Sequence, residues 1–301
     1  MHASPDGDET EAQVDEGASE RRPPYAAGAM RLSARVLRWY SRSGRTLPWR
    51  ETRDPYAILV SEVMLQQTQV SRVIPAYRRF LRRFPTLATL AGASLGDVLR
   101  TWSGLGYNRR ARDLQRIART NPTRLPRSIW QLDAFPGVGA YTAAAVACFA
   151  FGERVAFADT NIRRVLGRVL LGRVATSAEA VSLDELEMPA RRAAARWHHA
   201  LMDIGARYCA SRDPRCRECP LQVVCRAKGA GPAVARRRQS PFGTSDRRVR
   251  GRILGALRGQ DASLSQRALT RRVGDDRAPA LAERLVAEGL LVKAGRRYRL
   301  P

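Results

Sequence analysis

Apolar residues recur at helical spacing along most of the chain, and they predict a body built from helices. The helices that this spacing indicates span residues 32–40, 72–84, 94–102, 110–119, 162–171 and 190–206. A further helix begins at Asp54-Pro55-Tyr56, because proline is favoured at the first helical position. No alternating strand pattern occurs before residue 230. The main body is therefore predicted to be all-α.

The two ends of the chain differ from this body. Residues 1–27 are acidic and almost free of large apolar side chains, which predicts a disordered acidic tail before a main domain of residues 28–227. Residues 228–245 are rich in Gly, Pro and Arg and are expected to form a basic linker. The pattern of residues 246–301 predicts three short helices (249–257, 265–273 and 280–288) and then two short strands around a glycine turn. This order is winged-helix-like, and either contact with DNA or packing against the body is compatible with it.

A glycine turn separates two predicted helices in residues 135–161. Pro136 ends one helix, and Gly137 and Gly139 make a tight turn before a second helix that carries the apolar run 140–149. Backbone N–H groups at the start of that helix point outward, so such a turn can hold a phosphate without a side chain. The pattern is that of a helix-hairpin-helix, although a plain helical hairpin has the same turn.

Two carboxylates stand in contrasting surroundings. Glu62 lies within an apolar helix, where its neighbours at helical spacing carry no positive charge. Burial among apolar side chains disfavours the charged form, so we expect a raised pKa for Glu62. Asp159 stands directly before a predicted helix, where backbone N–H groups favour a negative charge, and a helix N-cap is its structural role.

The net charge of the chain indicates which class of molecule it binds. The 301 residues carry a formal net charge of +25, and arginine supplies nearly all of the cations. Because the first residues are acidic, the rest of the chain is strongly basic, and nucleic acid is the natural polyanionic partner. The sequence shows neither an apolar signal core nor a run of membrane-spanning length, so we expect a cytoplasmic protein that does not bind membranes.

Four of the five cysteines lie close together, at Cys209, Cys216, Cys219 and Cys225. Their spacing is too compact for an ordinary disulfide framework, and four thiolates without a nearby histidine suit either zinc or an iron–sulfur cluster. Cys148 stands apart in the apolar run and is interpreted as a core residue. His198 and His199 are interpreted as packing or surface residues, because no nearby carboxylate or cysteine pairs with them.

Five motifs together resemble one family. They are the run Ser-Glu-Val-Met-Leu-Gln-Gln-Thr at 61–68, Gly-Leu-Gly-Tyr at 104–107, the hairpin, Asp159-Thr160-Asn161 and the four cysteines. Their order and spacing over residues 30–226 resemble the MutY-type A/G-specific adenine DNA glycosylases of the endonuclease III-like superfamily. The resemblance implies a two-lobed helical body with a [4Fe–4S] cluster on the four cysteines. It also implies a monomer that removes adenine mispaired with 8-oxoguanine or guanine from double-stranded DNA.

The resemblance assigns roles to individual residues. Glu62 matches the general acid that protonates adenine and then helps to activate water, and Asp159 matches the carboxylate that stabilises the cationic sugar. Tyr141 and Asn161 match residues that support this site. The residues that match DNA contacts of the family are Gln67, Thr68, Tyr107, Gly137, Gly139, Arg212 and Arg215. The chemistry agrees, since an N-glycosidic bond that breaks through an oxocarbenium-like state needs one protonated carboxyl and one ionised carboxylate.

Tyr141 stands where related bifunctional glycosylases place a lysine. A phenol cannot form the Schiff base that strand cleavage requires, so the resemblance implies a monofunctional enzyme. Residues 246–301 are too few for the Nudix-like domain of many family members. Two alternatives remain open: another endonuclease III-like mismatch or damaged-pyrimidine glycosylase, and a non-catalytic iron–sulfur regulator with a winged helix that binds DNA.

Overall fold

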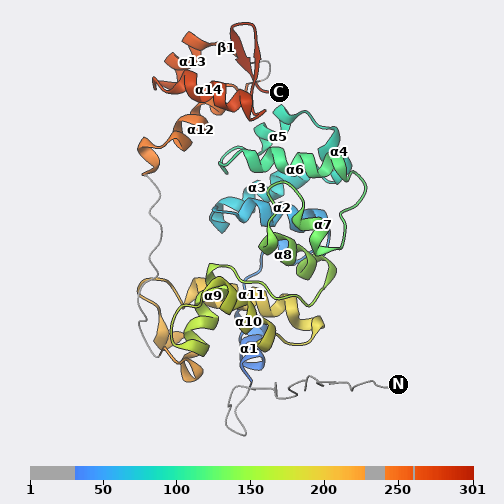
Figure 1. Cartoon of the computed structure of the whole chain (residues 1–301), viewed down its shortest axis with the longest axis vertical. Coiled ribbons are helices and arrows are strands. Elements are labelled where there is room, and N and C mark those ends of the chain that lie inside the picture. The colour runs from blue at the N-terminus through green and yellow to red at the C-terminus, as the bar shows by residue number, and fades with distance from the viewer. Residues whose placement is uncertain (1–30, 228–240, 260–261) are drawn as a thin grey trace, which may run out of the picture. The chain divides into compact units, whose positions relative to one another are not determined.

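Helices make up most of the chain in the computed structural model, which describes residues 31–227, 241–259 and 262–301 (Figure 1). The helices of the body are α1 (Leu32–Ser43), α2 (Pro55–Leu65), α3 (Val70–Arg83), α4 (Leu87–Gly92), α5 (Leu95–Thr101), α6 (Arg109–Thr120), α7 (Ile129–Asp133), α8 (Ala140–Phe151), α9 (Thr160–Leu166), α10 (Ser177–Glu187) and α11 (Arg191–Arg207). After them come α12 (Asp246–Ala256), β1 (Ser263–Ser265), α13 (Gln266–Val273), α14 (Ala278–Ala287), β2 (Val292–Ala294) and β3 (Arg297–Arg299).

The helices of the body pack in two groups, which Figure 1 separates. In one group α2 packs against α3 and α8, α6 against α4 and α5, and α7 against α8. In the other group α11 packs against α1 and α9, and α9 packs against α10. Residues 56–64 of α2 and 142–148 of α8 are buried on every side, which places both helices inside the protein. Their contact therefore fixes Glu62, which α2 carries, in the interior of the first group.

Local sequence sets where α2 and α8 begin. The side chain of Asp54 accepts a hydrogen bond from the backbone N–H of Tyr56 at 3.0 Å, and Pro55 takes the first helical position. Ahead of α8, Gly137 has a φ of 77°, a left-handed conformation that favours glycine. Gly139 is extended and forms the N-cap. The expected glycine turn between two helices, α7 and α8, is therefore present.

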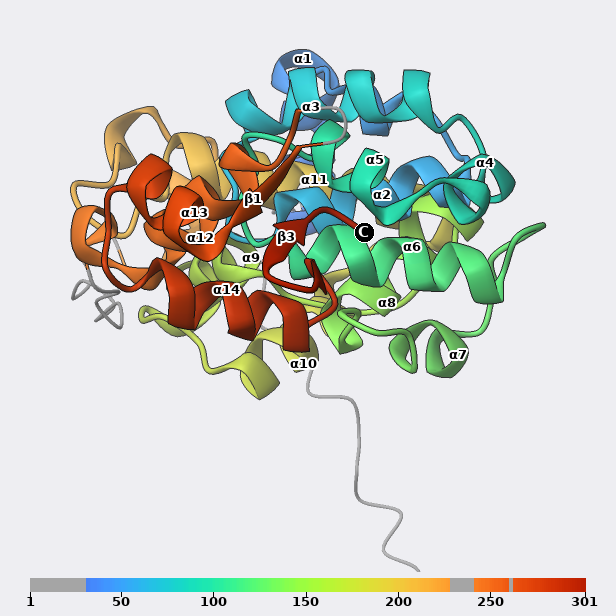
Figure 2. The same cartoon turned by 90° about the horizontal axis from the view of Figure 1, so that it is seen from above.

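The C-terminal module, which we define as residues 246–259 and 262–301, contains α12 to α14 and an antiparallel sheet of order β1-β3-β2. The module lies beside α5 and α6 (Figures 1 and 2), and its apolar side chains continue the core of the first helix group. The backbone N–H of Gly96 donates to the carbonyl of Pro301 at 2.8 Å. A Cβ at Gly96 would lie 2.6 Å from that oxygen, so this approach requires glycine.

The predicted fold class is confirmed: the body is helical, contains a helix-hairpin-helix and is followed by a small region with a sheet. Three features differ from the predicted elements. The helix predicted over 162–171 is α9 followed by a π-helical turn at Gly167–Leu171, the strand β1 was not predicted, and neither were the short helices α4 and α10. The helix α10 has no apolar stripe, but Thr176 and Glu179 form a capping box at its start.

The domain boundaries stay predictions. The acidic tail of residues 1–27 and residues 228–240 of the predicted linker lie outside the described residues. Among the described residues, no helix combines the length and the apolar character that crossing a membrane requires.

Candidate active site

A cavity of about 1770 Å³ gathers most of the predicted site residues. Those that line it are Glu62, Gln67, Thr68, Tyr107, Tyr141, Asp159 and Asn161. They come from α2 and the loop after it, the loop before α6, the start of α8 and the start of α9. Both helix groups of the body thus contribute to one site. Phe242, Arg247 and Arg250, from the region just before and within the C-terminal module, line the same cavity.

Glu62 is a buried carboxyl at this cavity. Its residue is 7% exposed, and burial raises the pKa of Glu62 to about 7, with a further upward contribution from the nearby Asp159. Arg50 acts in the opposite direction, and sequence reasoning did not find it because it lies 12 residues before Glu62. The guanidinium of Arg50 is itself held by Asp203, to which it donates at 2.8 and 2.9 Å. Near neutral pH a substantial share of Glu62 is therefore protonated.

Asp159 is surrounded by hydrogen-bond donors. Its Oδ1 accepts from the backbone N–H of Asn161 at 2.8 Å and of Ile162 at 2.7 Å, which makes it the N-cap of α9. Its Oδ2 accepts from the side-chain amide of Asn161 at 2.8 Å. Three N–H groups and the positive end of a helix stabilise negative charge on this carboxylate. The two carboxyl groups at the cavity thus have opposite electrostatic surroundings.

Asn161 is held from behind by two residues that sequence reasoning did not single out. Arg164 donates to the side-chain oxygen of Asn161 at 2.7 Å and to the carbonyl of Gly205 at 2.8 Å. A Cβ at Gly205 would lie only 2.5 Å from the Cβ of Asn161, so α11 can approach α9 this closely only with glycine there. The orientation of Asn161, and through it of Asp159, is fixed by this contact.

Tyr141 lies in the first turn of α8 and faces both carboxyl groups. Burial, together with the nearby charges of Glu62 and Asp159, raises the pKa of Tyr141 well above its ordinary value of 10. The phenol therefore stays protonated and acts as a neutral O–H group. Its ring packs edge to face against Phe157, with centroids 5.5 Å apart.

Arg110 organises the two loops at the mouth of the cavity, and sequence reasoning missed it. Its Nη1 donates to the carbonyls of Val63, Met64 and Gln66 at 2.8, 3.0 and 2.6 Å. Its Nη2 donates to the hydroxyl of Thr68 at 3.1 Å. Across the cavity mouth, the same Nη2 donates to the carbonyl of Gly106 in the loop before α6, at 3.2 Å. One buried guanidinium therefore ties together the end of α2 and the turn before α6.

Gln67 and Tyr107 stand at the tips of these loops, and both have a positive φ, of 56° and 47°. Such values are unusual for residues other than glycine and mark backbone that its surroundings hold in place. Tyr107 is 37% exposed, which excludes the structural alternative of a buried tyrosine. Two side chains thus project from strained loop tips beside the carboxyl pair.

The remaining predicted DNA contacts lie outside the cavity lining. Gly137 of the hairpin turn is connected to the site through Gln66, whose side-chain amide donates to its carbonyl at 3.2 Å and which lines the cavity. Gly139 caps α8. Arg212 is exposed in the loop between the first two clustered cysteines, and Arg215 forms an exposed ion pair with Glu218. The structure therefore does not bring these residues together with the carboxyl pair.

The four clustered cysteines are partly buried free thiols. Burial raises the pKa of Cys219 to about 11, and the charges of Cys209, Cys225 and Cys216 add to this, so the four sulfurs lie within electrostatic range of one another. Arg168, which is 2% exposed, donates to the Sγ of Cys209 at 3.5 Å, while its Nε and Nη2 have no hydrogen-bond partner in the described part of the chain. Four thiols beside a buried cation with unpartnered donors fit an anionic cluster. In the described part of the chain, no three or more His, Cys, Asp or Glu side chains are arranged to hold a single metal ion.

His198 corrects one expectation. It is buried, which is the packing alternative of the two that were predicted, but it pairs with both a carboxylate and a cysteine. Its Nε2 lies 2.7 Å from the Oδ2 of Asp184, whose other oxygen accepts from Trp197 at 2.6 Å, and its Nδ1 lies 3.6 Å from the Sγ of Cys148. Asp184 belongs to α10, a helix that the apolar pattern did not predict, so its partnership was not visible in the sequence. The ring of His198 stacks on Phe157 with centroids 3.9 Å apart, which supports the wall of the site behind Tyr141.

Known proteins are similar in sequence to this chain over most of its length. Residues 60–185 match the family described as HhH-GPD superfamily base excision DNA repair protein. A protein of Mycobacterium tuberculosis (strain ATCC 25618 / H37Rv) named adenine DNA glycosylase is 42% identical over 92% of this chain and 96% of its own length. A protein of Mycolicibacterium smegmatis with the same name is 45% identical over 74% of this chain and 79% of its own length. The chain belongs to the adenine DNA glycosylase family.

As a member of the adenine DNA glycosylase family, the chain is an enzyme that hydrolyses N-glycosidic bonds of adenine in DNA. This membership decides against the two alternatives, a pyrimidine glycosylase and a non-catalytic regulator. A solved structure, that of a thermostable thymine-DNA glycosylase, matches 65% of this chain and 94% of its own with a TM-score of 0.59 and 30% identity. The fold is therefore shared between glycosylases of different bases, and the residues at the cavity must set which base is removed.

Gly205→Ala is expected to damage the adenine DNA glycosylase site from outside the cavity. The new Cβ would meet the Cβ of Asn161, so α9 has to shift and carry Asp159 with it. Overpacking of this kind costs about 1–3 kcal/mol of stability, and a shift of the reacting geometry lowers single-turnover adenine release by about 10²-fold. Thermal unfolding and single-turnover kinetics measure both effects.

Gly255→Ala, in α12, is the control and should keep the wild-type rate, because its new Cβ would make only an ordinary van der Waals contact, 4.0 Å from a side-chain atom of Arg258. A wild-type rate for Gly205→Ala would contradict this account of Asn161.

Proposed function

We propose that the chain is a monofunctional base-excision-repair enzyme that hydrolyses the N-glycosidic bond of adenine mispaired with 8-oxoguanine or guanine. The observation that carries the proposal is the carboxyl pair at one cavity. Glu62 has a pKa of about 7, and Asp159 receives three N–H donors. One group is ready to give a proton near neutral pH and the other is ready to stabilise positive charge.

The reaction follows from these two groups. Protonated Glu62 transfers its proton to the adenine ring, and the bond between the base and C1′ of the sugar then breaks with its electron pair leaving on the base. The sugar becomes oxocarbenium-like, and the ionised Asp159 stabilises this cation at short range. Water adds to C1′ while the carboxylate of Glu62 accepts a proton from it, which restores the acid. The amide of Asn161 holds Asp159 in place, and the neutral phenol of Tyr141 lies close to both carboxyl groups.

Tyr141 supports the monofunctional part of the proposal. Strand cleavage by the related lyases requires an amine that attacks C1′, and a phenol whose pKa lies well above 10 supplies neither an amine nor an anionic nucleophile near neutral pH. Borohydride reduction during turnover tests this point. It should trap no covalent complex between the enzyme and DNA, and abasic sites should break only after treatment with alkali.

Double-stranded DNA containing A:8-oxoguanine or A:G mispairs is the proposed partner, bound by a monomer. Extruding adenine costs a few kcal/mol, less at a mispair, and the vacated space has to be filled. We assign Gln67 and Tyr107 to this wedge, with Thr68 beside them, because all three stand at the cavity mouth. We assign the flanking phosphates to the hairpin turn at Gly137 and Gly139 and to the basic loop of Arg212 and Arg215.

The four cysteines Cys209, Cys216, Cys219 and Cys225 are proposed to hold a [4Fe–4S] cluster. The cluster supplies a covalent crosslink that orders the loop after α11, and adenine hydrolysis needs no electron from it. Arg168 would stabilise the anionic sulfurs through its hydrogen bond to Cys209 and through its two donors that lack a partner among the described residues. Protein purified without oxygen is expected to be brown and to contain about four irons and four sulfides per chain. A colourless protein with one zinc per chain would contradict this assignment.

A release assay on four duplexes tests the proposed substrate. Adenine is placed opposite 8-oxoguanine, guanine, cytosine or thymine, and free base is measured by chromatography under single-turnover conditions. We expect release from the first two duplexes and little from the last two. Equal rates on all four would leave the family activity intact and would overturn the proposed mispair.

Base release is expected to fall as pH rises through about 7. The pKa of Glu62 is raised, so Glu62 is protonated below about pH 7 and loses its proton above it. Since a general acid acts only while protonated, the single-turnover rate should drop by about tenfold for each pH unit above that point. The measurement uses saturating enzyme at constant ionic strength between about pH 6 and about pH 9. A flat profile over this range would remove Glu62 as the acid of the slow step.

A further inference from the structure

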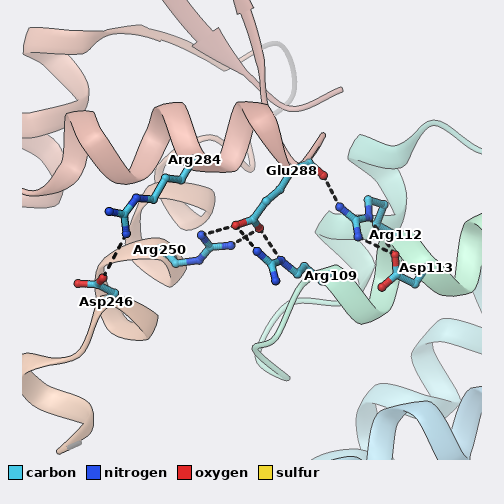
Figure 3. Close-up of polar contacts among 7 residues, drawn as sticks. All are labelled: Arg109, Arg112, Asp113, Asp246, Arg250, Arg284 and Glu288. Atoms are coloured by element: carbon cyan, nitrogen blue, oxygen red, sulfur yellow. Dashed lines mark hydrogen bonds and ion pairs between the residues drawn. The ribbon is translucent and has the colours of Figure 1, made fainter. Parts of the chain in front are cut away.

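The C-terminal module is joined to the body by a partly buried carboxylate, that of Glu288. Glu288, which follows the end of α14, accepts hydrogen bonds from Arg109 of α6 at 2.9 and 2.6 Å and from Arg250 of α12 (Figure 3). One carboxylate thus joins a body helix and two module helices. Two guanidinium groups on one partly buried carboxylate form a better oriented contact than a single exposed ion pair does.

Three further contacts join the module to the body. The guanidinium of Arg112, which also pairs with Asp113, donates to the backbone carbonyl of Glu288 (Figure 3). Arg100 donates to the carbonyl of Arg258 at 3.1 Å, and the backbone N–H of Gly96 donates to the carbonyl of Pro301. The C-terminal end of α14 therefore faces the body.

The start of α12 lies at the loop that carries Tyr107. Arg247 donates to the phenol oxygen of Tyr107 at 2.6 Å, and its guanidinium lies 5.8 Å from the centre of the Tyr107 ring. Arg110 of the body lies 5.3 Å from the same ring. Tyr107 is thus contacted by one cation from the body and one from the module. Arg247 and Arg250 of the module thus both have partners on the body or within the module.

We propose that Arg247 is a positioning residue that fixes the side chain of Tyr107 for base extrusion, so that docking of the C-terminal module contributes to the extrusion step. This inference rests on the wedge role of Tyr107 in the proposed function. A tyrosine at an exposed loop tip has rotational freedom, and insertion into a duplex loses that freedom at a cost in free energy. A cation that holds the hydroxyl and the ring in one orientation removes part of this cost before DNA arrives.

A simpler role for Arg247 is a cation that attracts phosphates. That role steepens the salt dependence of binding and does not depend on the hydroxyl of Tyr107. A positioning role requires that hydroxyl, because Arg247 donates to it. The two roles therefore differ in whether substitutions at the two residues act independently.

The experiment compares four variants of the full chain: Arg247→Ala, Tyr107→Phe, their double variant and Arg271→Ala. Arg271 is the matched control, an exposed arginine of α13 in the same module, outside the cavity lining. A 2-aminopurine next to the target adenine reports extrusion by fluorescence in a stopped-flow instrument, with enzyme saturating. We expect Arg247→Ala and Tyr107→Phe each to slow extrusion by about fivefold and the double variant to be no slower than either. Arg271→Ala should match the wild-type extrusion rate, and its salt dependence shows what loss of one charge alone does.

Two results would overturn the inference. One is an Arg247→Ala variant that matches Arg271→Ala in both extrusion and salt dependence. The other is a double variant whose slowing is the product of the single effects, since Arg247 then acts on DNA without Tyr107. Tyr107→Ala separates the inference from the proposed function: if it leaves extrusion unchanged, the wedge role itself fails. If Tyr107→Ala slows extrusion while Arg247→Ala does not, only the positioning role fails.

Discussion

Glu62→Gln is expected to abolish adenine release while leaving mispair binding close to wild type. The amide fills the same volume in α2 but has no acidic proton to give, and removal of a general acid typically costs about 10²–10⁴-fold in rate. We expect the upper end of that range, because the same carboxyl also accepts the proton of the attacking water. Single-turnover kinetics and a binding titration on the same mispaired duplex measure the two effects separately.

Glu185→Gln is the matched control for this variant. Glu185 is an exposed residue of α10 that pairs with Arg154, so the same chemical change there should leave the rate unaltered. Turnover of Glu62→Gln at the wild-type rate would remove Glu62 from the mechanism. Equal loss of binding and of turnover would instead show that Glu62 supports the architecture of the cavity.

The same substitution should stabilise the free protein at alkaline pH. The pKa of Glu62 is about 7 in the fold against an ordinary value of 4.5, so the folded state holds this proton more tightly than the unfolded chain does. Stability is therefore lost progressively between about pH 4.5 and pH 7, by on the order of 3 kcal/mol in total. Glutamine does not titrate, so the melting temperature of Glu62→Gln should exceed that of wild type at about pH 8, and the two should converge near pH 5. This difference is a stability cost of keeping an acid ready at the site.

The carboxyl pair was predictable from the sequence because the cause of each environment is local. Glu62 lies within a run that is apolar on every face of the helix, which is typical of a buried helix, and Asp159 directly precedes a helix. Burial and N-capping follow from these positions alone. The glycine turn of the hairpin was predictable for the same reason, since Pro136 and Gly137 determine it within a few residues.

The arginines that hold the site and the module in place were not predictable, because their partners are distant in the sequence. Arg50 pairs with Asp203, and Arg109 with Glu288, over separations of 153 and 179 residues. In the sequence these arginines look like many others in a strongly basic chain. Arg110 is the clearest case: it stands between Arg109 and Ala111, and only the fold shows that it is buried while Arg109 is exposed.

Arg110→Met is expected to have the second large effect, on stability and on activity together. The guanidinium of Arg110 satisfies carbonyls of both cavity loops, and methionine keeps much of the apolar volume without any donor. A buried acceptor left without its partner typically costs about 1–3 kcal/mol, and several lose theirs here. We therefore expect a loss of at least about 3 kcal/mol in the free energy of unfolding.

The expected loss of activity follows from what the loops carry. Arg110 donates to the loop of Gln67 and to the loop of Tyr107, so without it their strained backbone can relax and the two side chains no longer stand beside the carboxyl pair. Adenine release should fall by about 10²-fold even at temperatures where the variant is fully folded. Chemical denaturation, and single-turnover kinetics well below the melting temperature, measure the two effects.

Two further variants make this test specific. Arg116→Met removes an exposed arginine from the same helix α6 and should change neither stability nor rate. Arg110→Lys keeps the positive charge but lacks the planar fork that reaches both loops, so it should recover part of the stability and little of the rate. A lysine variant with the full wild-type rate would mean that charge alone is required at this position. A methionine variant that folds and releases adenine like the wild type would show that the loops hold their shape without Arg110. In either case the strained conformations of Gln67 and Tyr107 would need another cause.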